Sequence, residues 1–254
     1  VAGRVAYLLG DHEGSTLRLS RAAARYRELG QPLGVAQSLL YQALSELAAG
    51  RVSAARETLL EARQSFEEHG HPLGLASVDV GLAKVAHRRG DYAEAIERAE
   101  ATLERFEGLA NTAGMAASAR MSAMASLDAD DNHAAERAQR ALELTSAPHV
   151  DPWGQSEARL LLAQVALSKD DKSTARAHLR TVLQGKVSDA ELTQHRALTE
   201  AWLALVSNDP PLALAAIERA RKAFPDPRRT GDHTPQLVAR LLPLAKGTPA
   251  EAPL

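Results

Sequence analysis

The sequence predicts an all-α protein, a right-handed α-solenoid of about six helix–turn–helix units with a C-terminal capping helix. Alanine makes up about a fifth of the 254 residues, whereas aromatic residues make up 4% and isoleucine occurs twice. Helices favour Ala, Leu, Glu and Arg, and sheets favour β-branched and aromatic residues. A chain of this length is one large domain or a repeat array. A repeat of 40 residues and helical spacing of the apolar residues favour the array.

The 40-residue repeat is clearest in four turn segments that follow one another without insertions. Glycine ends helices readily because it adopts the left-handed conformation, and proline just after it blocks continuation of the helix. The segments are Gln31-Pro32-Leu33-Gly34, His71-Pro72-Leu73-Gly74, Asn111-Thr112-Ala113-Gly114 and Asp151-Pro152-Trp153-Gly154.

Further columns of the same period divide each unit into two helices. In the second unit we expect helices over residues 35–49 and 52–69, on either side of Gly50. Small residues recur where two helices should cross closely, and an aromatic column should pack between successive units. The columns are Gly10/Gly50/Gly90/Asp130/Asp170, Ser15/Ala55/Ala95/Ala135/Ala175/Ala215, Ala43/Ala83/Ala123/Ala163 and Tyr26/Phe66/Phe106.

The predicted organisation is a repeat array over residues 1–224, followed by a different C-terminal segment. The expected units are 1–34, 35–74, 75–114, 115–154, 155–193 and 194–224. Residues 225–233 contain two prolines and a glycine and predict a loop. Thr234-Pro235 is typical of a helix start and predicts a capping helix over 234–246, with a tail over 247–254.

These columns together resemble the tetratricopeptide repeat (TPR) over nearly the whole chain. The third unit carries the resemblance best, in Gly81-Leu82-Ala83 and in Gly90-Asp91-Tyr92-Ala93-Glu94-Ala95-Ile96. The period exceeds the 34 residues of the commonest version, and it resembles the longer repeats of MalT-like regulators and of bacterial signalling proteins. The resemblance implies a superhelix whose concave face is lined by the first helix of each unit.

Composition excludes several functional classes. A formal net charge of −2 provides no general field for holding nucleic acid or an anionic membrane surface. The absence of cysteine removes disulfides, thiolate metal sites and cysteine nucleophiles, and it fits a cytoplasmic location. No stretch approaches the length of a membrane span. The sequence does not begin with Met, and we expect it to be part of a longer regulatory or signalling protein.

No catalytic, cofactor-binding or metal-ligating residues are predicted. The phosphate-binding loop, dinucleotide fingerprint, zinc-protease and nucleophile-elbow motifs do not occur. Asp128-Ala129-Asp130-Asp131-Asn132 resembles the opening of a calcium loop, but His133 and Gln139 stand where Gly and Glu are needed. This segment falls on the repeat lattice and is predicted to be a turn between helices.

The resemblance places the partner-binding surface on the concave face of the first helices. An apolar strip with a few basic and amide groups suits a peptide or an amphipathic helix. The leucines could equally belong to the core between helices. The candidate residues are Leu40, Leu44, Leu47, Lys84, His87, Arg120, Met124 and Gln164.

We therefore expect a non-enzymatic scaffold or sensor module that binds a protein or peptide. The alternative is a small-molecule sensor domain of a transcriptional regulator or kinase, with its ligand near Arg120, Met124 and Gln164. Self-association through the N-terminal edge is a further expectation, because a shortened first unit leaves apolar surface open.

Overall fold

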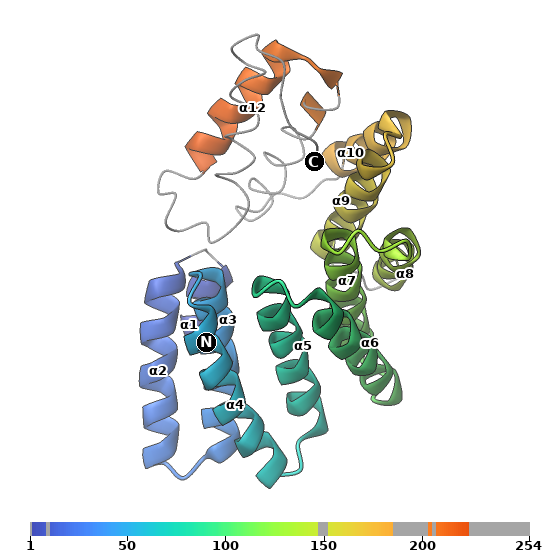
Figure 1. The fold of residues 1–254 in the computed structure, drawn as a ribbon. Coiled ribbons are helices and arrows are strands. Elements are labelled where there is room, and N and C mark those ends of the chain that lie inside the picture. The colour runs from blue at the N-terminus through green and yellow to red at the C-terminus, as the bar shows by residue number, and fades with distance from the viewer. Residues whose placement is uncertain (1, 9–10, 147–151, 185–202, 205–206, 224–254) are drawn as a thin grey trace. The chain divides into compact units, whose positions relative to one another are not determined.

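The computed structural model describes residues 2–8, 11–146, 152–184, 203–204 and 207–223, and the described residues include no strand. The chain divides into two compact units, residues 1–144 and 145–254. From here on, the first and second units are these two parts of the chain, and the 40-residue segments are called repeats. Its helices are drawn in Figure 1. The predicted loop, capping helix and tail over 225–254 lie outside the described residues. The helices are α1 Ala2–Leu8, α2 His12–Glu28, α3 Pro32–Ala48, α4 Val52–Glu68, α5 Pro72–Arg88, α6 Tyr92–Gly108, α7 Thr112–Asp128, α8 Ala134–Thr145, α9 Pro152–Ser168, α10 Lys172–Gln184 and α12 Pro210–Ala223.

Helix length and connection length together produce the 40-residue period. Each helix from α2 to α7 has 17 residues, and each of the connections between α2 and α7 has three residues. One helix and one connection therefore take 20 residues, and two helices make one sequence repeat. Consecutive helices pack against each other along the first unit, as an α-solenoid requires.

Every three-residue connection uses the same backbone geometry. Its middle residue has a positive φ, and its third residue donates a hydrogen bond to the carbonyl five positions back. His71 N–H, for example, donates to the Phe66 carbonyl at 3.0 Å. This pattern satisfies the last carbonyls of one helix, and the third residue then caps the next helix. The positive-φ residues of these connections are Gly30, Gly50, Gly70, Gly90, Ala110 and Asp170. Asp130 has a positive φ in the longer connection before α8, and Asn208 has one before α12.

The first helices begin three residues earlier than the sequence predicts. The structure starts α3 at Pro32 and α5 at Pro72, whereas the prediction treated these prolines as part of the turn. Proline fits the first helical position because its missing N–H would have no partner there. The His71 Nδ1 accepts a hydrogen bond from Gly74 N–H at 2.9 Å and so caps α5.

In α2, α4 and α6, an aromatic ring lies against a glycine of the following helix. A Cβ atom added at Gly74 would lie less than 3.0 Å from three atoms of the Phe66 ring. Tyr26 stands in the same relation to Gly34, and Phe106 to Gly114. The glycines of the repeat thus serve close packing as well as turn formation.

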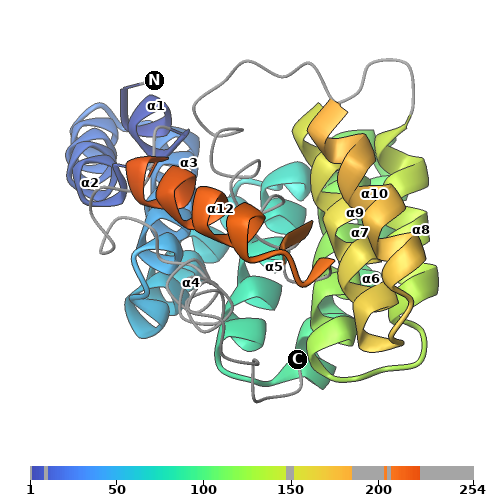
Figure 2. The same cartoon turned by 90° about the horizontal axis from the view of Figure 1, so that it is seen from above.

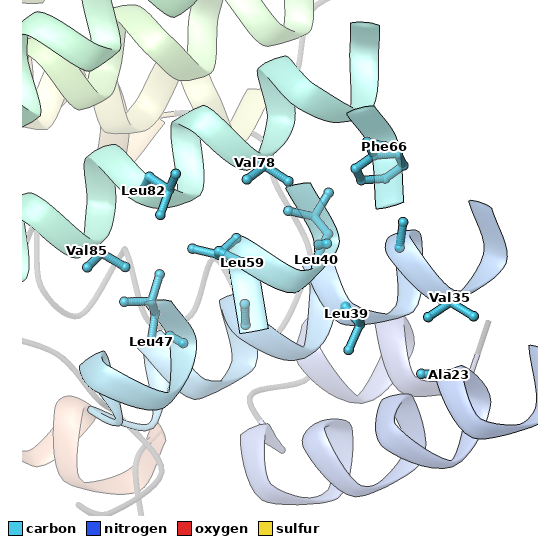
Figure 3. Close-up of a cluster of buried hydrophobic side chains, with 14 residues drawn as sticks. Ala23, Val35, Leu39, Leu40, Leu47, Leu59, Phe66, Val78, Leu82 and Val85 are labelled. Carbon is cyan, nitrogen blue, oxygen red and sulfur yellow. The ribbon is translucent and has the colours of Figure 1, made fainter. Parts of the chain in front are cut away.

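The core follows the predicted small and apolar columns. Ala43 and Ala83 are fully buried, and Ala123 and Ala163 nearly so. Figure 3 shows the cluster gathered between α3, α4 and α5, which includes Leu59 and Phe66.

The first unit has an inner and an outer row of helices. The odd-numbered helices contact one another as well as their sequence neighbours, in the pairs α1 with α3, α3 with α5 and α5 with α7. The even-numbered helices have no comparable contacts with one another in the described part of the chain. Helices that crowd on one side and spread on the other form a curved array, with the odd-numbered helices on the inner side (Figures 1 and 2).

In helix α8 the buried positions lie one residue earlier than the 40-residue period predicts. Its buried residues include Ala134, Ala138 and Ala141, whereas Ala135, the predicted column member, is half-buried. We attribute this shift to the turn before α8. The turn has five residues, so α8 begins at Ala134, two residues later than the starts of α4 and α6 predict. Hydrogen bonds from the His133 backbone and ring, and from Arg137, hold Asp131 in this turn. They lower the pKa of Asp131 well below the ordinary aspartate value.

The glycine–aromatic contact predicts opposite effects for one substitution at two positions. Gly74→Ala should lower the free energy of unfolding by about 1–3 kcal/mol, because the new methyl group overlaps the Phe66 ring. Gly108→Ala is the matched control and should raise it by about 0.5–1 kcal/mol, since no atom lies near its added Cβ. Urea unfolding followed by circular dichroism measures both changes, and equal effects would contradict the proposed overlap.

The Asp131 turn predicts a pH-dependent loss of stability. The pKa of Asp131 is lower in the folded chain than in the unfolded chain. Its stabilising effect is therefore complete above about pH 4, near the ordinary aspartate pKa, and declines as the pH falls further. Asp131→Asn should destabilise the chain at pH 7, and the difference from wild type should narrow at pH 3. A constant difference across urea unfolding curves at several pH values would rule out a role for the ionised carboxylate.

Candidate binding groove

A groove of about 520 Å³ lies along the inner row of helices in the first unit. The helices α3, α5 and α7 supply most of its lining, and α4 and α6 contribute one aromatic ring each. Its lining residues are Leu33, Gly34, Gln37, Leu40, Tyr41, Leu44, Phe66, His71, Leu73, Gly74, Ser77, Val80, Lys84, Phe106, Asn111, Gly114 and Ala117.

The lining repeats with the same period as the fold. Positions 33, 34, 37, 40 and 44 of α3 reappear as 73, 74, 77, 80 and 84 of α5. Residues spaced by three, four and seven positions share one face of a helix. Each inner helix therefore turns the same face to the groove, and α7 continues it with Gly114 and Ala117.

The apolar part of the groove is shaped by the glycine–aromatic contacts. Gly34, Gly74 and Gly114 have no side chains, and so the groove reaches the rings of Phe66 and Phe106. Leu33 and Leu73 stand at the edge and are 40% and 41% exposed. Apolar side chains that stay this exposed beside a concave surface are typical of a binding site.

The polar groups of the groove are few and mostly held in place. Ser77 Oγ donates to the Leu73 carbonyl at 2.8 Å, and the His71 ring stacks on Phe66 with 5.2 Å between centroids. The Arg4 guanidinium lies 5.1 Å from the centroid of the Tyr41 ring, a cation–π contact between α1 and α3. Lys84 contributes an ammonium group, and no Asp or Glu is among the described lining residues.

Three of the eight residues predicted for the partner surface line this groove, namely Leu40, Leu44 and Lys84. Leu40 is 8% exposed, so that it serves both the core and the groove floor. Leu40 therefore belongs both to the core between the helices and to the surface of the groove.

Leu47 and His87 lie elsewhere. Both are buried, and Leu47 belongs to the core cluster between α3, α4 and α5. The His87 Nε2 lies 2.7 Å from Asp128 Oδ2, which links α5 to α7. The ring also packs against Tyr92 with 5.6 Å between centroids. His87 thus has a structural role between helices.

Arg120, Met124 and Gln164 are half-buried and lie outside the lining. Arg120 and Met124 lie on α7 at the register positions of Leu40 and Leu44. Met124 packs against a buried cluster that includes Ala83 and Ala86. Gln164 is on α9 in the second unit.

The sequence reasoning missed the part of the groove formed by the first turns of the inner helices. Leu33, Gln37, Leu73 and Ser77 belong to it. These residues were missed because the helices were expected to begin at positions 35 and 75. Proline two residues before the recurring glycine is the signal that identifies the earlier start.

The segment that resembles a calcium loop lies in the turn between α7 and α8. Asp130 has φ 53° in the turn between α7 and α8, as the turn prediction requires. Among the side chains that the structure describes, no three or more His, Cys, Asp or Glu gather in a way that could hold a metal ion. Of the described helices, none is long and apolar enough to cross a membrane.

Comparisons with known proteins support the fold and leave the family open. No protein-family model matches the sequence, and no curated protein matches it. The structure is similar to the crystal structure of BtubC (BKLC) from P. vanneervenii, with a TM-score of 0.62 and 18% sequence identity. The match covers 84% of this chain and 90% of that one. At this identity the similarity shows a shared helical-repeat fold.

Proposed function

We propose that the chain is a non-enzymatic module that binds a segment of another protein in the groove of its first unit. The observation that carries the proposal is the repeated inner-helix face, which leaves apolar surface open over a volume of about 520 Å³. A groove of this kind binds peptides by taking up their apolar side chains.

The dimensions and chemistry of the groove describe the ligand. Packed helices lie about 8–10 Å apart, so α3 to α7 spans roughly 16–20 Å, enough for about five or six extended residues. Apolar ligand side chains would enter the depressions over Phe66 and Phe106. Since the described lining includes Lys84 and no carboxylate, the preferred segment also carries an acidic residue.

The family assignment and the cellular role belong to this proposal. The connection at Gly90-Asp91-Tyr92 and the long period resemble TPR arrays of MalT-like and signalling proteins, which supports a scaffold or sensor role in a larger bacterial regulator. The absence of cysteine supports a cytoplasmic location, and the net charge of −2 argues against a nucleic acid or membrane ligand.

A small-molecule ligand is the second candidate, and the groove volume supports it. Pockets for small ligands enclose about 300–1,000 Å³, and the groove falls in this range. A compound that binds only the folded chain raises its melting temperature. A thermal-shift screen against metabolites therefore separates the two candidates.

Two substitutions test the peptide groove. Peptides selected from a displayed library on the wild-type chain should bind Ser77→Arg about tenfold or more weakly, because the new side chain fills the groove. Lys84→Glu should weaken the acidic members of the selected set most. Fluorescence anisotropy measures both affinities.

Matched controls carry the same changes outside the groove. Ser53 on α4 and Lys169 after α9 are exposed, and Ser53→Arg and Lys169→Glu should leave peptide affinity within about twofold. Circular dichroism confirms that all four variants fold. Selected peptides that bind Ser77→Arg as tightly as wild type would place the peptide site elsewhere.

A further inference from the structure

A second hollow, of about 100 Å³, lies between α4, α5 and α6 in the first unit. It is distinct from the groove, because the residues that α5 contributes to it lie on the other side of that helix. At 100° per residue, Ala86 points away from Lys84, and Val85 away from Val80. Its lining residues are Arg56, Leu60, Arg63, Leu82, Val85, Ala86, Arg89, Glu94 and Arg98.

The lining of this hollow is rich in arginine. Four guanidinium groups line it, and Glu94 is the one carboxylate among its described lining residues. The floor is apolar, because Leu82, Val85 and Ala86 are buried. Cations above an apolar floor interact more strongly with an anion than they would in open water.

Neighbouring carboxylates hold three of the arginines by their inner nitrogens. Arg98 Nε lies 2.8 Å from Glu94 and Arg89 Nε lies 3.2 Å from Asp91. The ion pairs of Arg89 and Arg98 within the described residues do not involve the terminal nitrogens, which remain available for a ligand. Arg56 forms no ion pair with any residue that the structure describes.

Arg63 is the most firmly placed of the four. Its Nη1 lies 3.0 Å from Oδ1 of the buried Asp79, and its Nε lies 2.8 Å from Glu67. The hydrogen bond to Glu67 raises the pKa of Arg63 above its ordinary value. Arg105 of α6 binds the other oxygen of Asp79. A guanidinium fixed in this way loses less conformational entropy when it binds a ligand.

The repeat lattice does not require arginine at any of these positions. Equivalent residues one repeat earlier and one repeat later are small, apolar or hydroxyl-bearing. The four arginines are therefore specific to this place in the chain and do not recur with the 40-residue period. The equivalents of Arg56, Arg63, Arg89 and Arg98 are Thr16, Ala23, Ala49 and Thr58 in the earlier repeat and Ile96, Leu103, Ala129 and Ala138 in the later one.

We propose that Arg56, Arg63, Arg89 and Arg98 form a binding site for a phosphate-type oxyanion. Guanidinium groups bind such oxygens in pairs with charge-assisted hydrogen bonds. A water molecule needs about 10–15 Å³ of such a cavity, so the hollow takes a group of the size of phosphate. The oxyanion is either free phosphate or the phosphoryl group of a phosphorylated protein side chain.

Titration of the whole chain with inorganic phosphate tests the site. Arginine side-chain NMR signals should shift saturably with phosphate and should not shift with chloride at equal ionic strength. Arg98→Gln and Arg56→Gln should each weaken phosphate binding about tenfold, the effect of losing one charge-assisted contact. Arg25→Gln on α2 is the control and should leave it unchanged, because Arg25 is exposed and lies outside the hollow.

The second arm of the experiment identifies the source of the oxyanion. A phosphoserine peptide that binds at least tenfold more tightly than inorganic phosphate, and that loses this affinity in Arg98→Gln, assigns the site to a phosphorylated partner. Equal affinities assign it to free phosphate. No saturable shift in the wild-type chain, or equal shifts in the folded Arg98→Gln variant, would overturn the proposal. The groove variant Ser77→Arg should retain phosphate binding, so that the two proposals stand or fall separately.

Discussion

The packing of Phe66 against Gly74 joins the second helix of one repeat to the first helix of the next repeat. Tyr26 and Phe106 make the same contact with Gly34 and Gly114. A side chain on the glycine would move the two helices apart, and a smaller residue in place of the ring would leave a void. The same contact sets the depth of the groove, because the absence of a side chain brings the rings to its floor. The spacing of the repeats and the shape of the groove therefore depend on the same contact between an aromatic ring and a glycine.

The two candidate sites of the first unit arise in different ways. The groove is formed by positions that recur in each inner helix, so that it belongs to the architecture. The arginine hollow is formed by residues that interrupt the recurrence, and Asp79 holds part of it from within the core. A buried carboxylate shared by two arginines is costly unless both partners stay in place, which keeps α4, α5 and α6 in fixed relation around the hollow.

Much of the fold of the first unit could be predicted from the 40-residue period. Gly50 and Gly90 provide the left-handed residue of a turn, and Ala43 and Ala83 are small enough to be buried where helices pack closely. The groove was predicted in part. Leu40 and Lys84 follow from the resemblance to the TPR, which places the groove on the first helix of each repeat. Gln37 and Ser77 were missed because proline ends some helices and begins others. The one-residue shift of α8 could not be read from the period, since side-chain hydrogen bonds in the turn at Asp131 cause it.

The left-handed residue of the connections changes its identity along the chain. Glycine occupies it from Gly30 to Gly90, whereas Ala110, Asp130, Asp170 and Asn208 occupy it later. A non-glycine residue in this conformation costs about 1–2 kcal/mol that glycine does not. Neighbouring repeats of such an array share their stability only through their interfaces, so the cost stays local. Hydrogen exchange should therefore be graded along the molecule, with the amide protons of its later helices exchanging first.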